Sequence, residues 1–110
     1  MIGGHIAVSG TAPIGDDGTT VGVGDAYIQA QRCLEIIGKA LKDLGARFED
    51  VTRTRIFLVN VGDWEEVAHA HGEVFGDIRP ASTLVQVGGL IDPEWKVEIE
   101  ADAFVSKKER

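Results

Sequence analysis

The chain contains a single cysteine, three prolines and few aromatic residues, which make up 6% of its 110 positions. One cysteine permits no disulfide within the chain, which suits a reducing compartment, so we expect a cytoplasmic protein. No apolar run approaches the roughly 20 residues that a membrane-spanning helix needs. The first residues also lack the basic region and apolar stretch of a secretory signal. These absences argue against a disulfide-stabilised secreted domain and against a membrane protein.

Basic residues are also scarce, because 11 Lys and Arg stand against 18 Asp and Glu, giving a formal net charge of -7. Neutralisation of phosphates by basic side chains supplies most non-specific affinity for nucleic acid. The charge balance therefore argues against a broad nucleic-acid-binding surface. The length and the 44% apolar composition predict one domain, residues 1–110, with one modest core.

Residues 25–44 have the periodicity of an amphipathic helix, with apolar residues recurring at steps of three and four. Asp25 is the expected N-cap, and Gly45 follows the last turn. Cys33 lies on the apolar stripe. We expect it to be a small buried side chain and not a nucleophile.

A second helix is predicted to begin after Asp63, with Glu66 completing a capping box, and to end before Gly76. Its buried side is expected to hold five apolar residues: Trp64, Val67, Ala68, Val74 and Phe75. His69 and His71 on this helix are two positions apart and point in different directions. We therefore predict no metal site.

Four segments read as strands: residues 5–9, 51–60, 82–87 and 97–105. The order strand, helix, strand, helix, strand, strand predicts an α/β (α+β) domain with both helices on one face of a mixed sheet. The other sheet face would lack a cover from this chain, so we expect self-association.

Two of these strands have informative alternation. In the last strand, Glu98, Glu100 and Asp102 share one face and apolar residues share the other. The acidic face is either solvated surface or the wall of a polar cleft, and the pattern leaves both open. In the strand at 51–60, one face is expected to hold Val51, Arg53, Arg55, Phe57 and Val59.

The order Pro-Ala-x-x-x-Val-x-Val from Pro80, then a turn and Val-Glu-Ile-Glu-Ala from Val97, resembles the signature of the Rid family. This family is also called the YjgF or endoribonuclease L-PSP family. The resemblance continues through residues 7–13 and 50–64 and so covers nearly the whole chain. It implies a chorismate-mutase-like subunit, assembled as a homotrimer with ligand clefts between subunits. We expect no cofactor.

Rid deaminases hydrolyse imines and enamines such as 2-aminoacrylate; an arginine after Pro-Ala clamps the substrate carboxylate, and a glutamate positions water or moves a proton. The resemblance assigns the glutamate to Glu98 and the serine of an early Ser-Gly pair to Ser9. Ser82 occupies the arginine position, so the clamp is missing. Thr83 is expected to join the polar substrate-binding set, and Arg79 is the nearby cation that could substitute.

Several alternatives remain open. Hydroxyls and a carboxylate suit a neutral or cationic ligand better than an anionic one. The candidate functions are hydrolysis of imines, enamines or small amides, a non-catalytic metabolite-binding or regulatory trimer, and a ribonuclease or translation inhibitor. Ser9 could instead bond a backbone group of its own turn. Family members carry an extra N-terminal strand, so either the cleft is more open here or the natural start lies upstream of Met1.

Overall fold

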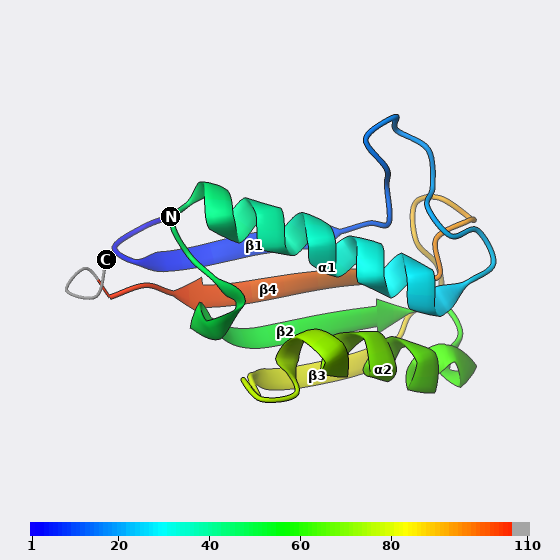
Figure 1. Ribbon diagram of the computed structural model, residues 1–110. Coiled ribbons are helices and arrows are strands. Elements are labelled where there is room, and N and C mark those ends of the chain that lie inside the picture. The colour runs from blue at the N-terminus through cyan, green and yellow to red at the C-terminus, as the bar shows by residue number, and fades with distance from the viewer. Residues whose placement is uncertain (107–110) are drawn as a thin grey trace.

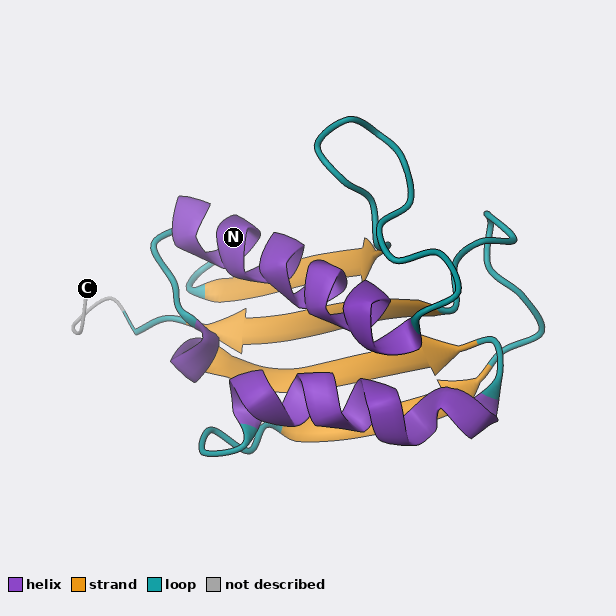
Figure 2. Ribbon diagram, turned by 45° about the vertical axis from the view of Figure 1, so that its right-hand side comes forward, coloured by secondary structure: helices purple, strands orange, loops and turns teal. Residues whose placement is uncertain are grey.

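A computed structural model describes residues 1–106 and shows a four-stranded sheet with both helices on one face (Figures 1 and 2). The elements are β1 (His5–Thr11), α1 (Ala26–Asp43), β2 (Val51–Leu58), α2 (Trp64–Phe75), β3 (Ala81–Gln86) and β4 (Val97–Phe104), with short 3-10 turns η1 (Phe48–Asp50) and η2 (Val61–Asp63). The strand order is β1-β4-β2-β3; only β2 and β3 are parallel. The predicted element order and mixed α+β sheet are confirmed.

The core lies between the sheet and the two helices. β4 runs through the middle of the sheet and turns alternate residues toward the helices, and Val97, Ile99, Ala101 and Ala103 are at most 1% exposed. Antiparallel pairing on both sides of β4 extends this apolar layer into β1 and β2. The same alternation directs the acidic residues of β4 to the opposite face.

Helix α1 agrees with its prediction at both ends. The side chain of Asp25 accepts a hydrogen bond from the backbone N–H of Ile28 at 3.0 Å, and Gly45 adopts a φ of +80° just past the last turn. Cys33 is completely buried on the core side. No helix among residues 1–106 is long and apolar enough to cross a membrane.

Helix α2 departs from its prediction at its start. Asp63 makes no capping hydrogen bond, so the expected capping box is wrong. Asp63 is instead the last residue of η2, and the side chain of Asn60 caps η2 by accepting from the N–H of Gly62 at 2.9 Å. Trp64 and Ala68 are exposed, contrary to expectation. The reason is rotational, because the residues that face the core are centred on Val67, Ala70 and Phe75.

Register shifts explain two differences in the strands, and β2 also ends at Leu58, two residues before its predicted end. A shift between Val8 and Thr11 lets β1 run two residues past its predicted end. A second shift separates Val51 from Arg53 in β2. An extra residue at such a bulge reverses which side the following residues face. Val51 is therefore buried opposite Ala103, and the expectation that it shares a face with Arg53 is wrong.

Candidate functional site

The sheet surface opposite α1 and α2, called here the open face, carries the predicted acidic residues of β4. Glu98, Glu100 and Asp102 are all half-buried there. Arg55 of β2 pairs with two of them, with Nη1 3.1 Å from Glu100 Oε1 and 3.2 Å from Asp102 Oδ2. Glu98 makes no ion pair within residues 1–106. One guanidinium is thus shared by Glu100 and Asp102, and Glu98 is the carboxylate of the three that has no ion pair among residues 1–106.

The carboxylate of Glu98 lies against the bulge of β1. A Cβ atom built on Gly10 would stand 2.8 Å from Glu98 Oε1, so only glycine leaves the carboxylate its present position. Ser9, the neighbouring residue, is exposed, and its hydroxyl forms no hydrogen bond within residues 1–106; its carbonyl accepts from Thr11 Oγ1 at 2.9 Å. Both the free hydroxyl and the free carboxylate are therefore available to a ligand.

Ser82 lies on the edge strand β3 and faces the helix side of the sheet. Parallel pairing places it beside Thr54 of β2, whose Oγ1 is 2.9 Å from Ser82 Oγ. The same Thr54 Oγ1 is 2.9 Å from Nε2 of His71 on α2. Burial lowers the pKa of His71 below the usual histidine value. Thr83, one residue further along β3, pairs with Arg55 and faces the open face.

Arg79 lies in the turn between α2 and β3. Its φ of +55° is in the left-handed region that few non-glycine residues adopt. Its backbone N–H donates to the Phe75 carbonyl at 2.9 Å, and its Nε donates to the Gly76 carbonyl at 3.4 Å. The guanidinium therefore turns back toward the end of α2 in this chain.

One chain does not bring the predicted site residues together. Ser9 and Glu98 lie on β1 and β4, whereas Ser82 lies on β3, with β2 between them. Ser82 and Glu98 also project from opposite faces of the sheet. The sequence analysis did not identify Gly10, Thr54 and His71 as their contacts. A pocket that contains Ser9 and Glu98 together with Ser82 would therefore need residues from a second copy of the chain.

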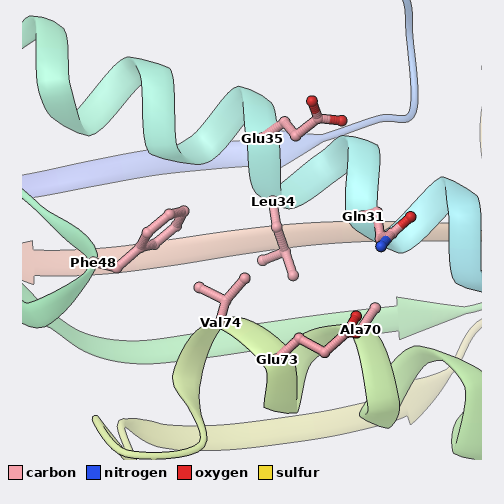
Figure 3. Close-up of a pocket in the computed structure, with 7 residues that line it drawn as sticks. All are labelled: Gln31, Leu34, Glu35, Phe48, Ala70, Glu73 and Val74. Carbon is pink, nitrogen blue, oxygen red and sulfur yellow. The ribbon is translucent and has the colours of Figure 1, made fainter.

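The groove between α1 and α2 is a separate feature on the outer surface (Figure 3). It has a volume of about 480 Å³ and is lined by Gln31, Leu34, Glu35, Phe48, Ala70, Glu73 and Val74. In Figure 3, Leu34 and Val74 point toward one another across its floor. None of the predicted site residues lines this groove.

Cys33 is expected to resist alkylation in the folded protein. Burial, with a smaller contribution from the carboxylate of Glu98, raises the pKa of its thiol to about 12. The thiolate is the reactive form, so the folded protein should react far more slowly with iodoacetamide at about pH 8 than the urea-unfolded protein. Equal rates in the two states, followed by mass spectrometry, would show that the thiol is accessible.

Comparison with known proteins identifies the family. The Endoribonuclease L-PSP family matches residues 1–105. The 3-aminoacrylate deaminase RutC of Acinetobacter baylyi is 37% identical over 100 residues, which cover 91% of this chain and 79% of RutC. Two solved structures resemble the fold. Rv2704 of Mycobacterium tuberculosis, a YjgF/YER057c/UK114 family member, has a TM-score of 0.85 at 41% identity, covering 96% of this chain and 82% of its own.

The second structure is TM0215 of Thermotoga maritima, described as a putative endoribonuclease. It has a TM-score of 0.91 at 30% identity and covers 96% of this chain and 83% of its own. The family resemblance read from the Pro-Ala and Val-Glu-Ile-Glu-Ala motifs is therefore confirmed. The chain belongs to the Endoribonuclease L-PSP family, also known as the YjgF or Rid family.

Proposed function

We propose that the protein hydrolyses imine or enamine derivatives of small amino acids to oxo acids and ammonia. The observation that carries this proposal is the carboxylate of Glu98, which is half-buried against Gly10 and unpaired beside two ion-paired neighbours. Membership of the family and similarity to a 3-aminoacrylate deaminase support an imine-deaminase-like role.

Glu98 would act as a general base toward a water molecule. The water oxygen adds to the imine carbon as Glu98 takes one of its protons, and the nitrogen takes up a proton from the solvent. The resulting carbinolamine returns its hydroxyl proton to the solvent as the carbonyl forms, the carbon–nitrogen bond breaks, and ammonia leaves with the proton that Glu98 returns. An enamine first gains a proton on its β carbon and then follows the same route.

The substrate-binding groups are proposed to come from two subunits. Ser9 and Glu98 lie at one side of the sheet and Ser82 on its edge strand at the other, so an assembly can bring the two sets together where a single chain does not. Thr83 lies on the open face, and Arg79 would have to release its contact with the Gly76 carbonyl to turn toward a bound carboxylate.

A homotrimer is the assembly that we expect. The open face mixes ion pairs with exposed apolar side chains, including Val85 at 42% and Phe104 at 54%, and association would cover them. Sedimentation velocity at micromolar concentration should give three times the chain mass of 11.8 kDa. A single species at the mass of one chain would contradict the trimer and leave the two-subunit site without support.

The function is tested by measuring ammonia and oxo acid release from freshly generated 2-aminoacrylate, 2-iminobutyrate and 3-aminoacrylate. The protein should accelerate at least one reaction above its spontaneous rate in proportion to enzyme concentration. Rates equal to the spontaneous ones for all three would reject the proposal. Saturable thermal stabilisation by the corresponding oxo acids without turnover would instead favour the metabolite-binding trimer. Salt-sensitive RNA binding in a gel shift would favour the nucleic-acid role.

A further inference from the structure

Three polar side chains from three elements form a chain of hydrogen bonds at the sheet edge. His71 Nε2 of α2 and Thr54 Oγ1 of β2 are 2.9 Å apart, and Thr54 Oγ1 and Ser82 Oγ of β3 are also 2.9 Å apart. Thr54 is fully buried, while Ser82 at the end of this hydrogen-bonded series is exposed. The series therefore runs from a half-buried imidazole to a hydroxyl that a ligand can reach.

The number of protons allows this series of hydrogen bonds only two arrangements. The Thr54 hydroxyl has one proton, so it can donate to Ser82 or to His71, but not to both. If His71 Nε2–H donates to Thr54, then Thr54 donates to Ser82, and the Ser82 proton is left for an acceptor on a ligand. If Ser82 donates to Thr54 and Thr54 to His71, then the Ser82 oxygen is left to accept. The protonation of one imidazole nitrogen thus decides what Ser82 offers.

We infer that His71, acting through Thr54, positions the Ser82 hydroxyl as a hydrogen-bond donor to a carboxylate or carbonyl oxygen of the substrate. This inference rests on the proposed function, because it assigns to Ser82 the substrate contact that an arginine makes in related deaminases. A neutral hydroxyl supplies one donor where a guanidinium supplies two and a charge. His71 makes up part of that difference, since its protonated form can only donate and so fixes the arrangement that an acceptor oxygen requires.

The surroundings of His71 permit this control. Its neighbours are the Thr54 hydroxyl and the ring of Phe75, whose centroid is 4.7 Å away, and no ion pair within residues 1–106 involves it. On α2 itself, His69 Nε2 lies 3.6 Å from Glu73 Oε2, and neither residue contacts Thr54. From β2, Arg55 faces the other side of the sheet and is held by Glu100 and Asp102. Burial lowers the pKa of His71, so the imidazole gains its proton at a lower pH than an exposed histidine does.

An acceptor ligand on Ser82 needs a proton on His71 Nε2, which the protonated imidazole always carries and the neutral imidazole carries in only one of its two tautomers, so such a ligand should bind more tightly to the protein with protonated His71. By linkage, such a ligand raises the pKa of His71, and its affinity increases as the pH falls through the pKa of the free protein. For the stable oxo acid 2-ketobutyrate, whose carboxylate stays ionised above about pH 5, we expect about threefold to tenfold tighter binding at pH 5 than at pH 8.

The experiment is an NMR titration of the full-length protein with 2-ketobutyrate at several pH values. His71→Gln and Thr54→Val should flatten the pH dependence, and Ser82→Ala should weaken binding and flatten it as well. Thr54→Ser keeps a hydroxyl and should retain the wild-type profile. His69→Gln is the matched control, because it removes an exposed histidine of the same helix that has no contact with Thr54. A merely structural role for His71 would change stability without changing this profile.

The results separate this inference from the proposed function. A wild-type profile that survives in His71→Gln, or binding that is unchanged in Ser82→Ala, would overturn the inference even if the protein is an active deaminase. Absence of saturable binding at every pH would overturn it too. The expected binding profile in a protein without turnover would uphold the inference and reject the deaminase.

Discussion

Replacement of Glu98 by glutamine is expected to lower kcat for imine hydrolysis by about 10²- to 10⁴-fold. Glutamine has nearly the same shape but cannot take a proton from water, so the water would lose its general base. The substitution should not disturb the fold, because the carboxylate forms no ion pair or hydrogen bond within residues 1–106. The measurement is steady-state turnover of the best substrate found above, with circular dichroism and thermal unfolding to establish the folded state.

Two further variants make this result specific to the position of the carboxylate. Glu100→Gln removes the next acid on the same face, which is already ion-paired with Arg55, and should change kcat by only a few fold. Gly10→Ala places a methyl group 2.8 Å from the present position of Glu98 Oε1 and should reduce turnover by displacing the carboxylate, with the protein still folded. Wild-type kcat in Glu98→Gln would assign the proton transfer to another group.

The second large effect is on stability. Replacing Gln29 with leucine is expected to lower the free energy of unfolding by about 3 to 5 kcal/mol. Gln29 lies on α1 and is completely buried. Its Nε2 donates hydrogen bonds to the carbonyls of Gly22 at 3.2 Å and Glu94 at 2.9 Å, and so holds the loop before α1 and the loop before β4. Its Oε1 accepts from the backbone N–H of Lys96 at 2.8 Å. Leucine fills a similar volume but leaves all three backbone groups without this partner.

Urea unfolding followed by tryptophan fluorescence measures this loss, at one protein concentration because association contributes to stability. The matched control is Gln31→Leu on the same helix. Gln31 is only half-buried and makes one hydrogen bond, from Nε2 to the Tyr27 hydroxyl at 2.8 Å, so its replacement should cost no more than about 1 kcal/mol. Equal losses in the two variants would show that Gln29 does not hold the loops.

Local patterns were sufficient to predict the elements but not their register. The α1 boundaries follow from the Asp25 cap, the apolar steps of three and four, and Gly45, all of which act within one turn of the helix. Alternation alone assigns Val51 to the wrong face, because the one-residue shift depends on how β2 pairs with β4. Hydrophobicity alone predicts a buried Trp64, because it does not say how a helix is rotated about its axis on the sheet.

The candidate site shows the same limit. Motif resemblance assigns Ser9, Glu98 and Ser82 to the predicted site, each from its own stretch of sequence. The contact between Thr54 and Ser82 depends on the parallel register of β2 and β3, and the approach of His71 depends on how α2 lies over them. Both are tertiary properties with no signal in local spacing.

The central place of β4 also bears on how the protein is made. β1 and β2 each pair with β4 and not with one another. β1 therefore has no strand to pair with until β4 has been synthesised. During synthesis, α1 and the β2–α2–β3 unit can begin to form, whereas β1 keeps its backbone groups unpaired until residues 97–104 have emerged. Such long-range closure slows folding and leaves an unpaired edge in the nascent chain. The final sheet therefore forms only after β4 has left the ribosome.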